Sequence, residues 1–181
     1  MNKLEKALDQ IFTHLTRKEK VFLKHLAGKV PKDGVILEVG SYLGASACFF
    51  ALGTKKPGQR IYCVDTWQND AMSEGKRDTF AEFLKNTAYF KEKIIPLRGY
   101  SEDIARTFDK KIDLLFIDAD HSYKGCNQDV KAWFPHLNPG AIVIFHDYGW
   151  AEGVQRTVKE FVKPIEKRSG VKVENTYWTV I

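Results

Sequence analysis

The sequence is poor in the features that mark secreted, membrane-spanning or repetitive proteins. Only three of its 181 residues are cysteine, and Cys48, Cys63 and Cys126 are odd in number and far apart, which predicts reduced thiols and not a disulfide framework. No apolar run approaches the roughly 20 residues that a membrane span needs. The first residues lack the apolar block of a signal peptide, and repeats and low-complexity tracts are absent. The sequence therefore predicts a cytoplasmic protein of one domain with no membrane partner.

The basic excess of the chain is not concentrated in a patch. The 28 Lys and Arg exceed the 23 Asp and Glu by five. Residues 1–30 hold seven basic and three acidic side chains, a net +4, and residues 151–181 contribute six and four, a net +2. Neither segment has the clustered basic and aromatic residues of a nucleic-acid groove. Solvated helix faces explain the charge better, so no nucleic-acid partner is predicted.

Helical and strand patterns alternate along the chain, which predicts an α/β fold. Apolar residues recur at helical spacing from Leu4 to Leu15, and Thr16 with Glu19 has the form of a capping box that begins a second helix. We interpret residues 1–30 as a helical extension of the domain at 31–181. Strands are expected at 35–39, 61–65, 94–98, 112–118, 141–146, 171–174 and 177–181, and further helices at 45–52, 80–89, 102–108, 123–134 and 154–165.

Strands separated by helices form right-handed crossovers, which predicts a doubly wound, mostly parallel, Rossmann-like sheet with helices on both faces. The runs 112–117 and 141–145 are largely apolar on both faces and should lie at its centre. Pro96 cannot donate a ladder hydrogen bond, which places the third strand at an edge. The last two strands suit a hairpin. The polar connection 66–79 is a candidate substrate loop.

Acidic residues close three of the predicted strands: Glu38, Asp65 and Asp118. A ligand of a parallel sheet lies across these carboxyl ends. The turn from Gly40 to Gly44 lets a ligand approach the backbone at a helix start, and Asp65 follows it by about 20 residues, where an acid can accept both ribose hydroxyls. The full G-x-G-x-x-G fingerprint is absent, which disfavours a dinucleotide. The pattern favours an adenosine-bearing ligand without a diphosphate; a purely structural turn is the alternative.

Five segments carry a resemblance to a known family: Glu38–Ser46, Val64-Asp65, Gly99–Ser101, Phe116–Tyr123 and Phe145–Tyr148. They resemble class I S-adenosylmethionine-dependent methyltransferases, in particular the small branch known as methyltransferase family 24, which is related in arrangement to catechol-type O-methyltransferases. The resemblance covers roughly residues 33–165, and its most specific parts are Asp-Ala-Asp-His-Ser-Tyr and His-Asp-Tyr. It implies a seven-stranded sheet whose last strand is antiparallel.

The resemblance also implies which residues bind S-adenosylmethionine. They are Glu38, Gly40, Ser41 and Gly44 at the methionine end, Asp65 at the ribose, Trp67 beside the adenine or sugar, Tyr100 and Ser101 near the adenine, and Asp118 and His121 toward the sulfonium.

A metal ion or a histidine base is expected to assist the reaction. In the catechol-type relatives the aspartate equivalent to Asp118 binds a divalent metal together with an Asp-Asn pair; this chain departs from that pattern with His146-Asp147. Asp118, His146 and Asp147 are candidate ligands, carboxylates favouring Mg or Mn and an imidazole shifting the preference toward Zn, Fe or Mn. Alternatively, His146 or His121 removes a hydroxyl proton, which makes Asp118, His121 and His146 the catalytic candidates. A structural hydrogen-bonding role is the remaining alternative for both histidines.

The predicted function is O-methyl transfer to a small-molecule acceptor by a monomer or homodimer. Residues 67–79, the N-terminal helices and residues 148–150 would select the acceptor. Two other functions stay open: a non-catalytic S-adenosylmethionine-binding protein, and a metal-dependent hydroxylase or hydrolase of the cephalosporin hydroxylase-like type.

Overall fold

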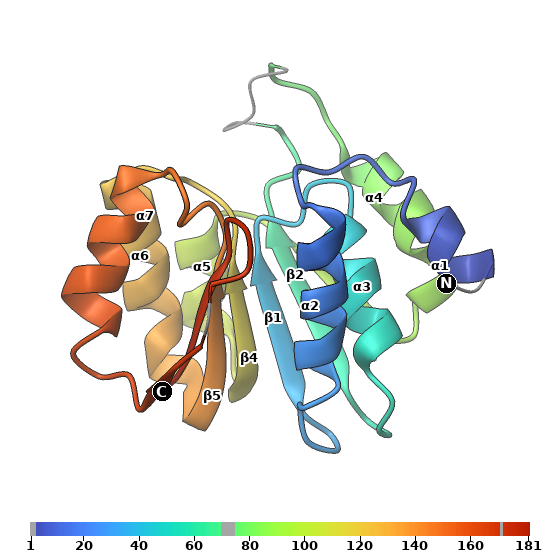
Figure 1. Cartoon of the computed structure of the whole chain (residues 1–181). Helices are drawn as coiled ribbons and strands as arrows, with labels where there is room; N and C mark the ends of the chain where they lie inside the picture. Colours follow the sequence, from blue (N-terminus) through green and yellow to red (C-terminus); the bar gives the residue numbers. More distant parts are fainter. Residues whose placement is uncertain (1–2, 70–74, 171) are drawn as a thin grey trace.

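The computed structural model describes residues 3–69, 75–170 and 172–181. Within them one sheet of seven strands runs in the order β3-β2-β1-β4-β5-β7-β6 (Figure 1). Strands β1 to β5 are parallel, β7 is antiparallel to β5, and β6 is antiparallel to β7. This order confirms the doubly wound sheet with an antiparallel late strand. The strands are β1 (Val35–Val39), β2 (Arg60–Asp65), β3 (Ile94–Arg98), β4 (Ile112–Ile117), β5 (Leu137–Phe145), β6 (Arg168–Ser169) and β7 (Tyr177–Val180).

Helices cover both faces of the sheet, with α1 to α4 on one side and α5 to α7 on the other (Figure 1). Short 3₁₀ turns at Ala88–Phe90 and Phe134–His136 end α4 and α6, and a π-helical turn at Val158–Val162 continues α7. The helices are α1 (Lys3–Leu8), α2 (Arg17–Ala27), α3 (Ala45–Gly53), α4 (Phe80–Thr87), α5 (Ser101–Thr107), α6 (Tyr123–Trp133) and α7 (Glu152–Thr157). None of the helices in the described part of the chain is long and apolar enough to cross a membrane.

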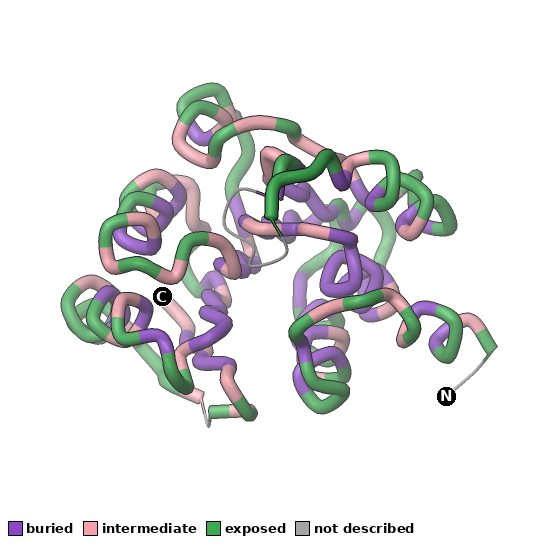
Figure 2. The backbone as a smooth tube through the Cα atoms, turned by 90° about the horizontal axis from the view of Figure 1, so that it is seen from above, coloured by how far each residue is buried: buried purple, intermediate pink, exposed green. Residues whose placement is uncertain are grey.

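The two faces bury separate apolar cores, because successive side chains of a strand point to opposite sides. On β1, Ile36 belongs to the core beneath α2 and α3, and Leu37 to the core beneath α5, α6 and α7; both are fully buried. The tube in Figure 2 is accordingly buried along the strands and exposed on the outer helix turns. Burial on both sides confirms the central position predicted for β4 and β5, and β3, which contains Pro96, lies at the sheet edge as expected.

The N-terminal helices differ in part from the sequence prediction. The capping box is confirmed: the Thr16 hydroxyl accepts from the Glu19 amide at 3.2 Å, and the Glu19 carboxylate accepts from the Thr16 amide at 2.9 Å. However, α1 ends at Leu8 and does not reach Leu15. Asp9, just beyond its end, pairs with the buried Lys20 of α2 at 2.5 Å, and this tertiary contact turns the chain away from the helix. The boundary at residue 30 stays a prediction.

The C-terminal hairpin forms, but earlier and shorter than predicted. Its first strand is β6 at Arg168–Ser169, and residues 173 and 176 make an isolated bridge near the turn. Residue 171 of the predicted strand lies outside the described residues. The turn is set by a tertiary contact, since Asn175 and Thr176 both donate hydrogen bonds to Glu19. Residues 70–74 of the expected substrate loop are also outside the described part.

Candidate functional site

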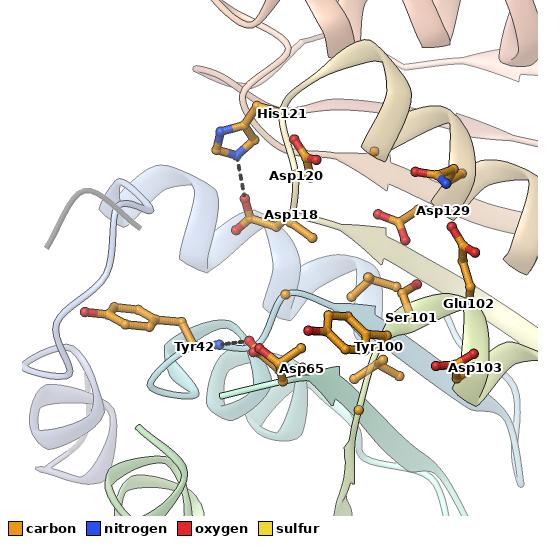
Figure 3. A pocket seen from close by; sticks show the side chains of 18 of the residues that line it. Tyr42, Asp65, Tyr100, Ser101, Glu102, Asp103, Asp118, Asp120, His121 and Asp129 are labelled. Carbon is orange, nitrogen blue, oxygen red and sulfur yellow. Dashed lines mark hydrogen bonds and ion pairs between the residues drawn. The ribbon is translucent and has the colours of Figure 1, made fainter. Parts of the chain in front are cut away.

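Two neighbouring cavities open at the carboxyl ends of β1, β2 and β4. The first measures about 820 Å³ and the second about 500 Å³, both within the range of small-molecule sites. In Figure 3, Asp65 and Tyr100 border the first cavity on one side and Asp118 and His121 on the other. The second cavity lies beneath the N-terminal segment and is lined by Phe12, Thr13, His14, Gly40, Ser41, Tyr42, Leu43, Ala45, Ser46, Asp118, Ala119, His121, Asp147, Trp150 and Asn175.

The glycine turn after β1 brings the backbones of two strands close together. Gly40 has φ +86°, and a Cβ there would lie 2.0 Å from the carbonyl oxygen of Asp118, so only glycine fits. Gly44 also has φ +86°, but its missing Cβ faces Thr87 and Phe83 of α4. Gly40 lines both cavities, whereas Gly44 lines neither. Glycine is required at position 44 because α4 packs against it.

Asp65 holds the glycine turn and faces the first cavity. Its Oδ2 accepts from the amides of Ser41 and Tyr42, both at 2.8 Å, and its Oδ1 accepts from the amide of Trp67 at 2.7 Å. A carboxylate has about four acceptor positions. Three are occupied by the backbone, which leaves Oδ1 able to accept another hydrogen bond.

Trp67 is not at the cavity, contrary to the expectation that it flanks the adenine or sugar. It is fully buried between Phe80 and Phe83, with ring centroids 4.8 and 4.7 Å away. Its indole donates to the Tyr42 carbonyl at 2.9 Å. The aromatic helix α4, which the tryptophan packs against, draws it into the core. Trp67 therefore supports the turn from behind.

The far wall of the first cavity comes from α5 and α6. Tyr100 is 67% exposed and lines the cavity, whereas the Ser101 hydroxyl accepts a hydrogen bond from the Trp133 indole at 2.8 Å and is tied to α6. Asp129, which the sequence interpretation missed, lines the same wall and is buried. Burial raises the pKa of Asp129 to about 6 although Ser101 lowers it. Its place at helical spacing from Cys126 gave no sign of a cavity.

Glu38 lies beneath the turn and lines neither cavity. It is fully buried on the central strand β1, and neither carboxyl oxygen has a hydrogen-bond partner in the described chain. Burial raises its pKa to about 7, while the nearby hydroxyls of Ser46 and Ser41 lower it in part. The Ser41 hydroxyl is likewise buried without a partner. A buried acid without a hydrogen-bond partner is uncommon in proteins, which marks Glu38 as a residue with a role beyond packing.

Asp118, His121, His146 and Asp147 meet at the border of the two cavities. His121 Nε2 lies 2.8 Å from Asp147 Oδ2 and 4.0 Å from Asp118 Oδ1. His146 Nδ1 lies 3.1 Å from Asp118 Oδ1 and 3.2 Å from Asp147 Oδ2. Burial raises the pKa of both aspartates, but the two histidines outweigh it and hold these pKa values below their usual range. The cluster is thus a set of alternating charges.

His146 is closed off from both cavities, which corrects its prediction as a base and metal ligand. It is 2% exposed, its Nδ1 faces Asp118 and Asp147, and its Nε2 lies 3.5 Å from Glu19 Oε1. Burial lowers the pKa of His146, but these carboxylates raise it to about 12. His146 lines neither cavity, so its ring does not reach a substrate or a metal bound there.

His121, which was predicted as a candidate base, takes the place of His146 in the metal-ligand set. It is 39% exposed and lines both cavities. The carboxylates of Asp118 and then Asp147 raise its pKa to about 9. Asp118, His121 and Asp147 each offer a ligand atom, all within 4.8 Å of one another. This set of two carboxylates and one imidazole suits a divalent metal such as Mn or Zn.

Comparison with known proteins shows which family and which solved structures this fold resembles. Residues 37–148 match the family described as a methyltransferase domain. An O-methyltransferase from Bacillus cereus in complex with S-adenosylhomocysteine has the same fold, with 16% identity and a TM-score of 0.72 over 100% of this chain and 92% of that one. The O-methyltransferase TomG from Streptomyces achromogenes, involved in tomaymycin synthesis and solved with S-adenosylmethionine, gives 18% identity and 0.72 over 99% and 90%.

Two sequence relatives are uncharacterised proteins. One, from Sinorhizobium fredii, is 30% identical over 116 residues, which are 62% of this chain and 13% of the relative. Another, from Acanthamoeba polyphaga mimivirus, is 26% identical over 156 residues, 80% of this chain and 66% of the relative. The chain thus spans only a small part of the first relative's length and 66% of the second's.

Proposed function

Because the chain belongs to the methyltransferase domain family that its residues 37–148 match, we propose that it transfers a methyl group from S-adenosylmethionine to an oxygen of a small-molecule acceptor. The donor would occupy the larger cavity and the acceptor the smaller one.

The border that the two cavities share is the main support for this proposal. Five residues line both of them: Gly40, Tyr42, Asp118, Ala119 and His121. Methyl transfer requires the acceptor atom and the methyl carbon to approach within about 3 Å in line with the breaking bond. A shared border between two cavities supports such an approach. The enzyme would act chiefly by aligning them.

Donor binding is proposed for residues at the strand ends. Asp65 would accept from a ribose hydroxyl through Oδ1, Gly40 would receive the methionine end with Glu38 supporting the turn from beneath, and Tyr100 would cover the adenine. The bound cofactor supplies a methyl group on a positively charged sulfur. The carboxylate of Asp118 at the border favours a cation there. Trp67 is omitted from this set because it lies in the core.

Acceptor binding is proposed for the second cavity, where Phe12 and Trp150 are large exposed aromatics at the wall. His121, once it has lost its own proton, is the group placed to hold the acceptor hydroxyl and take its proton, since it lines both cavities. A divalent metal held by Asp118, His121 and Asp147 would supply the alternative means of lowering the proton affinity of the hydroxyl.

The donor assignment is tested by calorimetry with S-adenosylhomocysteine. Wild-type protein should bind at micromolar concentration, and Asp65→Asn should weaken binding about tenfold or more, as expected when a charged acceptor is lost. Asp113→Asn is a matched control: Asp113 also accepts from a backbone amide, Val35 N at 2.8 Å, but it lines neither cavity. Absence of binding in the wild type would remove the assignment, and equal losses in both variants would remove the role of Asp65.

The metal assignment has a separate test, the binding of Mn²⁺ followed by electron paramagnetic resonance. Asp147→Asn should weaken Mn²⁺ binding, whereas Asp120→Asn, a neighbouring acid outside the cluster, should not. Identical Mn²⁺ binding in both variants, or none in the wild type, would leave His121 alone as the assisting group. The donor assignment does not depend on this result.

A further inference from the structure

Glu19 is a buried acid that does more than a helix cap requires. Its side chain is 0% exposed. Oε2 accepts from the Thr16 amide at 2.9 Å, which completes the capping box of α2. Oε1 accepts from the Asn175 amide and the Thr176 hydroxyl, both at 2.9 Å, and lies 3.5 Å from His146 Nε2. A capping box needs only one oxygen of the glutamate. The other oxygen joins the β6–β7 turn to the site.

The His146 ring connects Glu19 to the border of the two cavities. One ring nitrogen faces Glu19 and the other faces Asp118 and Asp147. Nδ1 forms a hydrogen bond with Asp118, whereas Nε2 is buried without a hydrogen bond among the described residues and faces Glu19 at ion-pair distance. Rotation of the ring would break the hydrogen bond on one side and the ion pair on the other. Without the Glu19 charge, Asp118 and Asp147 would remain at Nδ1, but Nε2 would be left in the protein interior without the ion-pair partner that faces it. The orientation of His146, and through it that of the two aspartates, therefore depends on Glu19.

We propose that Glu19 is a positioning residue that fixes, through His146, the carboxylates of Asp118 and Asp147 where the two cavities meet. This inference rests on the proposed methyl transfer for its functional consequence, but the contacts themselves do not. Glu19, Asn175 and Thr176 lie outside the family match at 37–148. Helix α2 and the C-terminal hairpin thus both contact the carboxylate of Glu19, which connects these two segments to the site.

The proposal is tested on the His146 ring protons by nuclear magnetic resonance, with assignment by their loss in His146→Gln. Glu19→Gln keeps the volume and removes the charge. It should shift or broaden the Hδ1 signal, which lies on the far side of the ring from the substitution. Two controls keep the Glu19 charge: Thr16→Ala breaks the cap and Thr176→Val removes one hydrogen bond. Both should retain the Hδ1 signal. An unchanged signal in Glu19→Gln, or an equal change in Thr16→Ala, would overturn the proposal.

Urea unfolding of Glu19→Gln, His146→Gln and the double variant shows whether each variant folds, and it measures the free energy of unfolding of each. Residues that act as one unit should give a double variant more stable than the sum of the single losses predicts; additive losses would contradict the coupling. Mn²⁺ affinity should also fall about tenfold in Glu19→Gln, as for outer partners of metal ligands, with Thr176→Val near wild type. A wild type that does not bind S-adenosylhomocysteine would refute the proposed function, while the ring-proton result would still decide the role of Glu19.

Discussion

Substitution of Glu38 by glutamine should make the protein more stable at alkaline pH and less able to bind its cofactor. Glu38 is a fully buried acid whose two oxygens have no hydrogen-bond partner among the described residues. Burial raises its pKa from 4.5 to about 7. Such a group stays protonated in the folded protein at a pH where the unfolded chain has already released the proton. Wild-type stability therefore falls as the pH rises between these values.

The size of the effect follows from the pKa difference. The pKa of Glu38 rises by about 2.5 from 4.5 to about 7, and at about 1.4 kcal/mol per pKa unit this is a loss on the order of 3 kcal/mol. Below pH 4.5 both states carry the proton and the term is absent; above pH 7 it is complete. Glu38→Gln removes this penalty. The stability of the variant relative to wild type should thus rise by up to about 3 kcal/mol between pH 4 and pH 8.

Urea unfolding followed by circular dichroism at pH 4, 6 and 8 measures this difference. Glu92→Gln, which replaces an exposed acid, should follow the wild type at every pH. Calorimetry of Glu38→Gln with S-adenosylhomocysteine should show weaker binding, since Glu38 lies beneath the turn that is proposed to receive the methionine end. A stability difference that stays flat from pH 4 to pH 8 would refute the reasoning, because it would mean that Glu38 titrates alike in both states.

Two further substitutions test the turn and its support. Gly40→Ala should destabilise the fold by about 2 kcal/mol or more, because φ is +86° and the new Cβ would meet the Asp118 carbonyl. The control Gly140→Ala, with φ +85° and open space around it, should cost only about 1 kcal/mol. Equal losses of stability in urea unfolding would contradict the close approach of Gly40 to Asp118. Trp67→Phe should cost about 1–3 kcal/mol through the lost volume and hydrogen bond while S-adenosylhomocysteine affinity stays close to wild type; a large loss of affinity with normal stability would return Trp67 to the cofactor site.

Local sequence patterns predicted most of the fold correctly. Alternating strand and helix periods gave the parallel strands and crossover helices, because these periods depend only on neighbouring residues. The edge position of Pro96 followed from its missing amide hydrogen. The first helix was predicted to extend to Leu15 because its apolar spacing continues past Leu8. An ion pair between Asp9 and Lys20, which spacing cannot reveal, turns the chain there.

The candidate site was predicted in outline but not in its connections. Asp65 and Asp118 close their strands, so their approach to the glycine turn followed from the topology alone. The sequence could not distinguish His121 from His146, since both sit beside aspartates after a strand. Only the structure places His121 on the cavities and turns His146 toward a carboxylate 127 residues earlier in the chain, at 3.5 Å.

The amino-acid sequence by itself determined the sheet, the glycine turn and the acids at the strand ends, because each depends on short-range periodicity or on the conformational range of single residues. The tertiary structure alone decided which side chains face a cavity and which are buried behind it. That choice depends on contacts between segments far apart, such as Glu19 with Thr176, and on the cost of burying a charge without a partner.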